Sequence, residues 1–422
     1  GVESRFKGVM RTEIVSVGTE LLLGQIVDTN AAELGQIFAR YGVSHTHRQT
    51  VGDNLGRLTE ALERALSRAD LVVTIGGLGP TEDDLTRDGI AAALADHLVE
   101  DAEVLAGLRT MFAERGLPWV DSLARQAQRP TCARPLPNPN GTAPGLHAEK
   151  NGKHVVALPG PRNEFIPMVE TSLAEILASL SGGTIASRTL RVIGLGESRI
   201  EEMISDLLVG QAATIAPYAK VGEVHLRVTA QASSRDAAEA AIHPMVEELY
   251  ARLGDAIYGE GESSLPQVLI EGLARRSQTV ATAESCTAGL VAAALTGVEG
   301  SSAVVQGGVV TYSHQAKQAW LGVETDLLVD PERGAISEAC ARSMAEGVRQ
   351  RWSVDYAVAV TGIAGSAPYE ENGVVKPNGL VYVAVAGPLG TQAASATYRG
   401  NRETIRGRAV MFALDALRRA LG

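Results

Sequence analysis

The sequence has few of the features that would attach a protein to a membrane or build it around disulfides. Only three of its 422 residues are cysteine, and Cys132, Cys286 and Cys340 lie far apart with no CxxC pair. This odd, scattered set of thiols fits a reducing compartment and excludes a thiolate zinc site. No apolar run approaches about 18 residues, and no basic segment followed by an apolar one opens the chain. We therefore expect a cytoplasmic protein without a membrane span or a secretory signal.

Positive charge is also scarce. The 38 Lys and Arg residues are outnumbered by 49 Asp and Glu residues, which gives a net charge of −11. This balance argues against nucleic acid as a partner. None of the eight histidines belongs to an HExxH pattern, so we predict no imidazole metal cluster. An anionic ligand would have to be held locally, by glycine loops, helix N-termini or a few arginines.

The order of strand-like and helical segments predicts three folded parts. Hydrophobic residues make up 45% of the chain and charged residues 21%, as in globular proteins, and 422 residues exceed one ordinary core. The first nine residues look like an expression scar. The expected parts are an α/β domain over 10–181, a small α+β domain over 184–258 and a second α/β domain over 265–422, with Gly-rich linkers at 181–183 and 259–264.

Both α/β domains are predicted to be layered. In the first, segment 71–75 (LVVTI) is apolar on both faces, as in the middle of a parallel sheet, and a helix over 163–180 carries an apolar stripe. In the last, a strand over 279–283 leads into a helix expected from Thr287 to Leu295. Between these domains a β-α-β-β-α order predicts the small α+β domain.

Polar residues gather at three strand-to-loop junctions of the last domain, namely 283–289 (AESCTAG), 311–317 (TYSHQAK) and 361–365 (TGIAG). Open α/β sheets bind ligands beyond the carboxyl ends of their strands, where all three junctions lie. Ser285 precedes a helix whose first amides could stabilise an oxyanion. Lys317 could activate the serine hydroxyl if burial lowers its pKa. Tyr312 could relay or donate a proton to the leaving group.

Simpler interpretations of these residues stay open. Ser285 or Thr287 would serve as a helix N-cap, and Lys317 would be a solvated surface charge. Cys286 is a rival nucleophile, for which His314 is the nearest candidate base.

Together the three junctions closely resemble the C-terminal domain of the competence/damage-inducible protein A (CinA) family, which is the nicotinamide-nucleotide amidohydrolase (NMN deamidase) family. The resemblance extends over about 265–422. It implies hydrolysis of the carboxamide of nicotinamide mononucleotide (NMN) to nicotinic acid mononucleotide and ammonia, with no cofactor. It makes Ser285 the nucleophile, Lys317 the base and Tyr312 an assisting group. The other residues expected there are Thr287 and Thr361 in catalysis, and Gly289, Gly362, Ala364, Gly365, Arg402 and Arg406 in substrate binding.

Two details around this site depend on the comparison with the family. The family usually shows two glycines after the threonine, whereas Ala288 stands in the first place here, and its methyl group could crowd the start of the helix. Arg402 and Arg406 lie one turn apart near a helix N-terminus, so both can face one anion. We expect them to bind the substrate phosphate, although a solvated basic helix face is the simpler alternative.

A second candidate site lies in the first domain, in segments 17–20 (VGTE) and 75–86 (IGGLGPTEDDLT). Glycines at a strand end let the backbone approach a phosphate. Glu20, Asp83 and Asp84 would repel a bare anion, so a hard cation such as Mg²⁺ is expected between them and the phosphates. The segments match neither a P-loop nor GxGxxG. The simpler alternative is a helix cap surrounded by solvated acids.

With 138–145 (NPNGTAPG) and 158–161 (LPGP), these segments resemble the molybdopterin-cofactor-binding fold and the N-terminal domain of CinA. In that family the domain implies a pyrophosphatase that converts ADP-ribose to AMP and ribose 5-phosphate. Its divalent cation would be Mg, Mn or Co, with a monovalent cation as a further candidate. Molybdopterin binding is the alternative role. The residues expected to bind this substrate are Gly18, Thr19, Glu20, Asn30, Gly76, Gly77, Gly79, Pro80, Thr81, Asn140 and Gly141.

The expected protein is thus a homodimeric, bifunctional hydrolase of pyridine-nucleotide salvage. Its middle domain would resemble a KH module, but it is acidic and has no GxxG clamp, which argues against RNA binding. The rival is a molybdopterin- or nucleotide-binding scaffold without catalysis, and Ser285, Tyr312 and Lys317 favour the enzyme at the C-terminal site. A part in DNA uptake or repair would follow only from the family's name, and the net charge does not support it.

Overall fold

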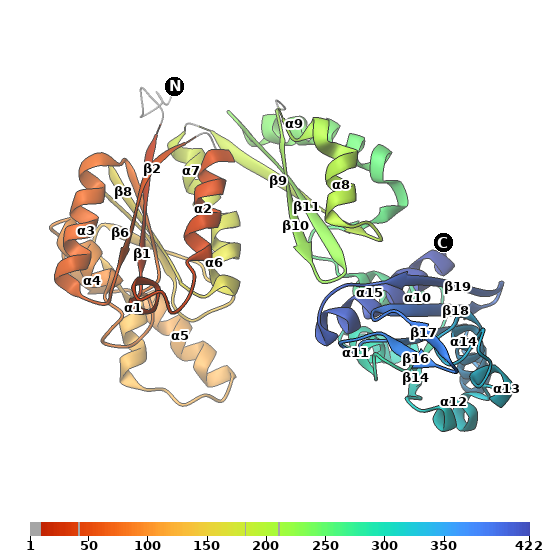
Figure 1. The fold of residues 1–422 in the computed structure, drawn as a ribbon. Coiled ribbons are helices and arrows are strands. Elements are labelled where there is room, and N and C mark those ends of the chain that lie inside the picture. Colours follow the sequence, from red (N-terminus) through yellow and green to blue (C-terminus); the bar gives the residue numbers. More distant parts are fainter. Residues whose placement is uncertain (1–9, 41–42, 182, 210–211) are drawn as a thin grey trace. The chain divides into compact units, whose positions relative to one another are not determined.

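The structure is a computed structural model that describes residues 10–40, 43–181, 183–209 and 212–422. The expected expression scar at 1–9 and Gly182 of the expected first linker lie outside the described residues. The chain forms two compact units, Gly1–Ile185 with Gln231–Ala238, and Ala186–Ala230 with Glu239–Gly422. The fold is mixed α/β with three domains, as predicted (Figure 1).

The N-terminal domain is built on a six-stranded sheet in the order β2-β1-β3-β8-β7-β6. Its strands are β1 (Arg11–Val17), β2 (Ser44–Val51), β3 (Leu71–Ile75), β6 (Ala133–Leu136), β7 (Gly145–Lys150) and β8 (Lys153–Leu158). The first four strands in the sheet order are parallel to one another. Strand β7 is antiparallel to both of its neighbours, β8 and β6. Every residue of β3 is buried, because helices cover both faces of the sheet. A separate antiparallel pair consists of β4 (Leu98–Glu100) and β5 (Gln128–Pro130).

Alternate residues of these strands supply two cores. Ile14 and Val73 pack toward α2, α6 and α7, while Val15 and Val72 pack toward α3 and α4. Figure 1 shows the two helical layers on either side of the sheet. The helices of this domain are α1 (Thr19–Leu22), α2 (Thr29–Arg40), α3 (Leu55–Arg68), α4 (Thr86–Ala93), α5 (Ala102–Glu114), α6 (Arg162–Met168) and α7 (Ala174–Leu180).

The helix predicted over 163–180 is not regular throughout. A π-helical turn, Val169–Leu173, separates α6 from α7. Pro167 lies just before it, and proline lacks an N–H and crowds the preceding turn, which accounts for the irregularity. The hydroxyl of Thr171 donates to the carbonyl oxygen of Pro167 at 2.8 Å. The apolar face is kept, since Phe165 and Leu173 are both fully buried.

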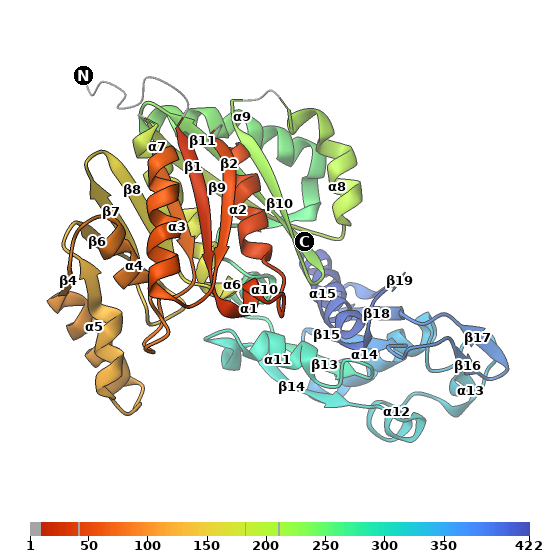
Figure 2. The same ribbon diagram turned by 60° about the vertical axis from the view of Figure 1, so that its left-hand side comes forward.

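The middle domain is a four-stranded sheet in the order β10-β11-β9-β12, with α8 and α9 packed beside it (Figure 2). Strands β10 and β11 form one antiparallel pair, and β9 and β12 form another. Its elements are β9 (Thr184–Ile193), α8 (Glu197–Ile204), β10 (Thr214–Lys220), β11 (Glu223–Ala232), α9 (Arg235–Leu253) and β12 (Ile257–Glu260). Strand β12 pairs with β9 and was not predicted, because its four residues show no clear alternation.

The C-terminal domain contains a five-stranded sheet in the order β14-β13-β15-β18-β19. Its strands are β13 (Val280–Glu284), β14 (Val305–Val310), β15 (Tyr356–Gly362), β18 (Leu380–Gly387) and β19 (Gly390–Thr397). The first three strands in the sheet order are parallel to one another. Strand β18 is antiparallel to both of its neighbours, β15 and β19. A separate hairpin, formed by β16 (Tyr369–Glu371) and β17 (Val374–Lys376), lies in the connection between β15 and β18.

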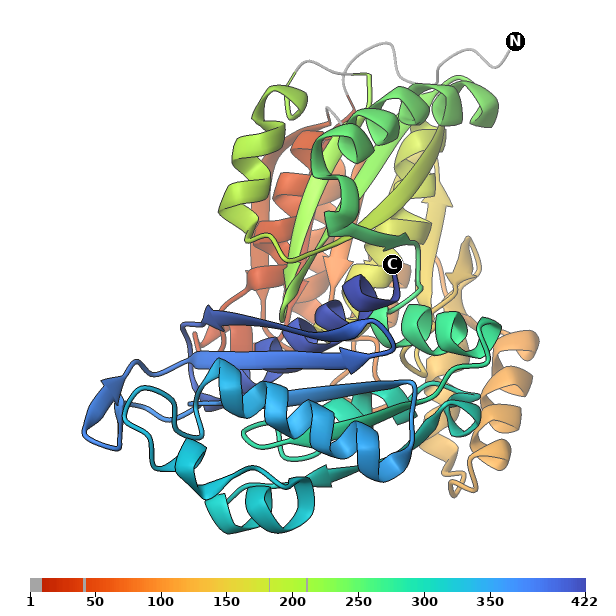
Figure 3. The same cartoon turned by 90° about the vertical axis from the view of Figure 1, so that its right-hand side faces the viewer.

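Helices cover both faces of this sheet as well (Figure 3). Val358 and Val360 pack toward α10, α11 and α15, whereas Ala357 and Ala359 pack toward α14 on the other face. The helices are α10 (Leu265–Arg275), α11 (Leu290–Thr296), α12 (His314–Leu321), α13 (Thr325–Leu328), α14 (Glu338–Trp352) and α15 (Arg402–Leu421). Among the described residues, no helix has the length and apolar character needed to cross a membrane.

Candidate functional sites

The C-terminal site lies where β13, β14 and β15 end. Ser285 directly follows β13, and its backbone N–H donates to the carbonyl oxygen of Val360 in β15 at 2.9 Å. Lys317 lies one turn into α12. Ser313 is the N-cap of this helix, and its side chain accepts a hydrogen bond from the N–H of Ala316 at 3.0 Å. Because β13 and β14 are neighbours in the sheet, the segments after them meet.

Lys317 and Ser285 are in hydrogen-bond contact. The Lys317 Nζ atom is 3.0 Å from the Oγ atom of Ser285, 2.8 Å from the carbonyl oxygen of Thr311 and 3.3 Å from that of Tyr312. Only 1% of the Lys317 surface is exposed. Three uncharged acceptors therefore aim the buried amine at the serine hydroxyl.

Burial sets the protonation of the groups around the serine. It lowers the pKa of Lys317, because desolvation disfavours the ammonium form. It raises the pKa of the Cys286 thiol to about 11 and that of the Cys340 thiol to about 12. The amine thus moves toward its basic form while both thiols stay protonated. This difference favours the serine over Cys286 as the nucleophile.

The amides of Val291 and Ala292 at the start of α11 already have a partner, so they are not the free donors that the sequence predicted. The helix begins at Leu290, three residues later than expected. The buried carboxylate of Glu284 accepts hydrogen bonds from the N–H groups of Val291 at 2.8 Å and Ala292 at 3.1 Å. These helix donors are thereby used within the protein. The hydroxyl of Thr287 donates to the same carboxylate at 2.6 Å, so Thr287 supports the turn after Ser285.

The delayed helix start leaves a tight turn after the serine. Ala288 has a φ of 48° and Gly289 a φ of 100°, so both lie in the left-handed region. Glycine adopts that region freely, whereas alanine is strained there by roughly 1–2 kcal/mol. The sequence suggested that the methyl group of Ala288 could crowd the start of the helix. In the structure its effect is instead on the backbone conformation of the turn.

A cavity of about 330 Å³ opens beside Ser285. Of the residues predicted for this site, it is lined by Ser285, Tyr312, Lys317, Gly362, Ala364 and Arg402. Five others are not among its lining residues: Thr287, Gly289, Thr361, Gly365 and Arg406. Thr361 is fully buried, and its hydroxyl donates to the carbonyl oxygen of Ala335 at 2.7 Å.

The two arginines of α15 do different things. The guanidinium of Arg402 donates to the carbonyl oxygen of Ala364 and to the hydroxyl of Tyr312, each at 3.0 Å, at the wall of the cavity. That of Arg406 donates to the carbonyl oxygens of Cys286 at 3.0 Å and Thr287 at 3.3 Å. Arg406 therefore holds the turn after Ser285 and, unlike Arg402, is not among the residues that line the cavity.

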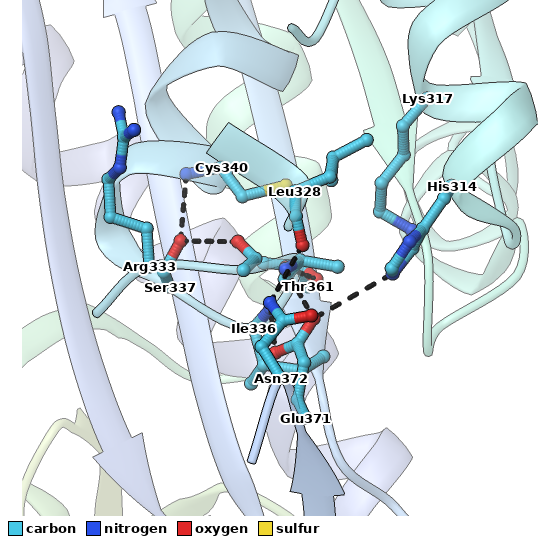
Figure 4. Close-up of polar contacts among 12 residues, drawn as sticks. His314, Lys317, Leu328, Arg333, Ile336, Ser337, Cys340, Thr361, Glu371 and Asn372 are labelled. Atoms are coloured by element: carbon cyan, nitrogen blue, oxygen red, sulfur yellow. Dashed lines mark hydrogen bonds and ion pairs between the residues drawn. The ribbon is translucent and has the colours of Figure 1, made fainter. Parts of the chain in front are cut away.

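The structure adds residues to this cavity that the sequence did not indicate. Tyr369 and Glu371 reach it from the β16–β17 hairpin, and His314, considered only as a base for Cys286, lines it from α12. The Nε2 atom of His314 is 3.7 Å from an Oε1 oxygen of Glu371 (Figure 4). No sequence signal could have found Glu371, because the hairpin is short and its distance along the chain from Ser285 is large.

The N-terminal site is a larger cavity of about 1300 Å³ at the carboxyl ends of β1, β3 and β8. Most residues predicted for it line the cavity, namely Gly18, Glu20, Asn30, Gly76, Gly77, Gly79, Thr81, Asp83, Asp84, Asn140 and Gly141. Thr19 and Pro80 are not among the lining residues. The Thr19 hydroxyl instead donates at 3.1 Å to Asp53, which does line the cavity.

Glycine is required in the loop that follows β3. Gly76 and Gly77 have φ values of 98° and 73°. A Cβ atom on Gly76 would lie 2.4 Å from the carbonyl oxygen of Val17, and one on Gly77 would lie 2.1 Å from the hydroxyl of Thr86. Consecutive left-handed residues form concave backbone surfaces suited to anions. The loop therefore fits a phosphate-bearing ligand.

A buried cation underlies the same loop. Arg87 of α4 is 1% exposed, and its guanidinium donates to the carbonyl oxygens of Gly79 at 3.1 Å and Leu78. Burial lowers the pKa of Arg87 to about 10, so it stays charged at neutral pH. Its charge lies beneath the loop and partly offsets the acidic lining of the cavity.

The acids of this cavity do not form a metal cluster by themselves. The Asp84 carboxylate accepts from the N–H of Thr81 at 2.9 Å and from its hydroxyl at 2.8 Å. Within the described parts of the chain, no three His, Cys, Asp or Glu side chains are placed to hold a metal ion. Mg²⁺ commonly takes only one or two carboxylates, with substrate phosphates and water completing its shell. Glu20, Asp83 and Asp84 fit that mode, in which the cation arrives with a phosphorylated ligand.

The fold and the two sites define a three-domain α/β protein with a cavity at the carboxyl ends of the strands in each of two sheets. Residues 13–179 match the family described as "Probable molybdopterin binding domain", residues 187–259 the "Damage-inducible protein CinA KH domain", and residues 262–421 the "CinA C-terminal domain". The chain belongs to the CinA family.

Full-length relatives show the same relationship. A CinA-like protein of Dictyoglomus thermophilum is 45% identical over 415 residues, which cover 98% of this chain and 99% of that protein. A CinA-like protein of Dictyoglomus turgidum is 44% identical over 415 residues with the same coverage. A solved structure, described as the protein CinA with unknown function from Thermoplasma acidophilum, is 34% identical. It covers 39% of this chain and 98% of its own, with a TM-score of 0.37.

The strained turn after the nucleophile leads to a stability prediction. We expect Ala288→Gly to raise the free energy of unfolding by up to about 1 kcal/mol, because glycine relieves the left-handed strain at some cost in unfolded-state entropy. Urea unfolding followed by circular dichroism would measure the change. Gly289→Ala is the matched control and should lower stability. An Ala288→Gly protein less stable than the wild type would contradict this account of the turn.

Proposed function

We propose that the C-terminal site hydrolyses the carboxamide of NMN to nicotinic acid mononucleotide and ammonia. The observation that carries the proposal is the 3.0 Å contact between the buried Lys317 amine and the Ser285 hydroxyl. A serine needs a base within hydrogen-bond reach to act as a nucleophile, and a desolvated lysine is such a base near neutral pH. The family resemblance supplies the substrate.

The reaction would proceed in two halves. Neutral Lys317 takes the proton of Ser285 as its Oγ atom attacks the carboxamide carbon, and an oxyanion forms. The backbone N–H of Cys286, next to the nucleophile in the turn, is the group we expect to meet that oxyanion. The Lys317 ammonium then returns the proton to the nitrogen as the C–N bond breaks, which releases ammonia and leaves an acyl-serine. Water attacks the acyl-serine while Lys317 takes its proton. The ammonium then returns that proton to the Ser285 Oγ atom as the C–Oγ bond breaks, and nicotinic acid mononucleotide leaves.

Two further residues would orient the substrate. Arg402 is the cation that lines the cavity, so we propose it for the phosphate of NMN. Tyr312 accepts a hydrogen bond from Arg402 and is 60% exposed. It would move together with Arg402 when substrate binds, or donate a proton to the leaving group. Thr361 and Arg406 would act on the shape of the site, the first through Ala335 and the second through the turn after Ser285.

The nucleophile and base can be tested by ammonia release from NMN. We expect Ser285→Ala to lower kcat by about 10³-fold or more and Lys317→Met by about 10²–10⁴-fold. Cys286→Ala is the control, because it removes the rival nucleophile and should keep most of the activity. Full activity in Ser285→Ala, or its loss only in Cys286→Ala, would refute the assignment.

The pH dependence follows from the direction of the Lys317 pKa shift. Because the neutral amine is the base, kcat/KM should rise with pH and level off above a pKa lower than that of an ordinary lysine. In the window between the folded and unfolded pKa values, the unfolded chain binds more protons, so the stability of the wild type should rise with pH. Lys317→Met should lack that rise. Rate profiles and urea unfolding across this window would test both, and flat profiles would contradict them.

We propose that the N-terminal site hydrolyses ADP-ribose to AMP and ribose 5-phosphate with a divalent cation, Mg, Mn or Co. The glycine loop, the charge of Arg87 and the surrounding acids support a diphosphate ligand. When bound, the cation would neutralise diphosphate charge and activate water. Asp84 and Glu20 would hold it, while the backbone of Gly76–Gly79 would receive the phosphates. A molybdopterin- or nucleotide-binding scaffold without catalysis is the second candidate, since the same loop suits any phosphorylated ligand.

Asp84→Asn would separate the roles of this acid. The amide oxygen can still accept the hydrogen bonds of Thr81, but the charge is lost. We expect the divalent cation concentration needed for half-maximal AMP release to rise by about tenfold or more. Thr81→Ala is the matched control, because it weakens the loop and keeps the carboxylate. Wild-type protein that binds AMP but hydrolyses no ADP-ribose with any of the three cations would support the binding scaffold instead.

A further inference from the structure

A buried carboxylate from the β16–β17 hairpin reaches the C-terminal cavity. Glu371 is the last residue of β16, is 4% exposed, and lines the same cavity as Ser285 and Lys317. The turn of the hairpin is fastened by Asn372, whose side-chain amide donates to the carbonyl oxygen of Leu328 at 2.8 Å. The hairpin thus delivers an acidic group to a cavity whose chemistry depends on an amine.

The carboxylate is bound to the loop that precedes α14. Its Oε1 oxygen accepts from the backbone N–H of Ala335 at 2.5 Å, and its Oε2 oxygen accepts from that of Ile336 at 3.2 Å. Gly334 has a φ of 79°, and a Cβ atom there would lie 2.5 Å from the Glu371 carboxyl carbon. The loop therefore passes so close to the carboxylate that only glycine fits.

A second charge completes this attachment. The ammonium of Lys376, in β17, lies 2.9 Å from Glu371 Oε2 and also donates to the carbonyl oxygens of Arg333 and Ile336, each at 2.6 Å. Thr361 also donates to the carbonyl oxygen of Ala335 at 2.7 Å. Figure 4 shows Glu371 and Thr361 beside the loop segment that contains Ile336. Ala335 and Ile336 both line the cavity, so the contacts fix one of its walls.

Glu371 is the carboxylate that acts on Lys317. The titratable groups that line the cavity with this amine are Cys286 after β13, Tyr312 after β14, His314 in α12, Tyr369 and Glu371 in β16, and Arg402 in α15. Cys340 also acts on it from α14, and Lys376 of β17 is paired with Glu371. The two thiols stay neutral because burial raises their pKa values. Burial is the main influence on the pKa of Lys317 and lowers it, and the negative charge of Glu371 in the same cavity acts in the opposite direction.

We propose that Glu371 is a positioning residue of the C-terminal site: it ties the 334–336 wall to the hairpin and places a negative charge in the cavity that holds the Lys317 amine. The proposal rests on the proposed amidohydrolase function. Lys376 moderates the same charge through its ion pair. Charged residues of the hairpin would then help to set the pH range in which Lys317 acts as a base, while Lys317 itself stays the same.

Glu371→Gln tests the charge with little change of shape. Removing the negative charge favours neutral Lys317, so the acidic limb of kcat/KM against pH should move to lower pH. One pH unit below the wild-type midpoint, the variant should keep about threefold more of its own plateau rate than the wild type keeps. A merely structural role would lower the rate at every pH alike and leave the midpoint in place.

Two further variants separate charge from reach. Lys376→Met leaves Glu371 uncompensated, so its midpoint should move to higher pH. Glu371→Asp keeps the charge on a side chain one methylene shorter, so KM should rise while the midpoint stays. Circular dichroism and urea unfolding would establish that each variant is folded. If Glu371→Gln does not fold, the Lys376→Met profile alone decides.

The outcomes distinguish the proposal from the function on which it rests. Wild-type protein that releases no ammonia from NMN at any pH would overturn the proposed amidohydrolase. Active wild type with an unchanged midpoint in a folded Glu371→Gln or Lys376→Met variant would overturn only the role of Glu371. Opposite shifts in these two variants would support it.

Discussion

The burial of one amine is the constraint on which the C-terminal domain depends. An ammonium group loses its water when it is enclosed, so enclosure shifts Lys317 toward the neutral form that can accept a proton. The amine must still be aimed, and backbone oxygens of the segment after β14 do this without adding charge. The turn that presents Ser285 is held by Glu284 from one side and Arg406 from the other. The proposed base is thus aimed by uncharged backbone oxygens, and the charged side chains around it hold the turn and the wall of the cavity.

The N-terminal domain buries a cation that keeps its charge, whereas burial shifts Lys317 toward its neutral form. Arg87 is as enclosed as Lys317, but a guanidinium does not give up its proton at neutral pH. Its partners are two loop carbonyls, so its charge remains available to a ligand on the other side of the loop. A lysine suits proton transfer and an arginine suits anion binding. The two domains of this CinA-family chain use similar sheets and place these different cations at the ends of their strands.

The sequence predicted the strand ends at which the two cavities lie, but not all of the residues that line them. The positions of Ser285 and Lys317 followed from strand ends, because parallel strands bring their carboxyl ends to one edge. The start of α11 was placed too early, since the sequence does not show that Glu284 turns back to cap it. Spacing along one helix suggested a shared role for Arg402 and Arg406, yet the turn after β13 draws Arg406 away. Glu371 was missed because its partners lie about 35 residues earlier in the chain.

The sequence by itself determined the alternation of strands and helices, the glycine loops and the absence of disulfides. These features depend on local patterns and on residue chemistry, which can be read without coordinates. Only the tertiary structure decided which side chains lose their water, because burial depends on segments far apart in the chain. The basic amine of Lys317, the protonated thiols, the charged Arg87 and the enclosed Glu371 all follow from that burial.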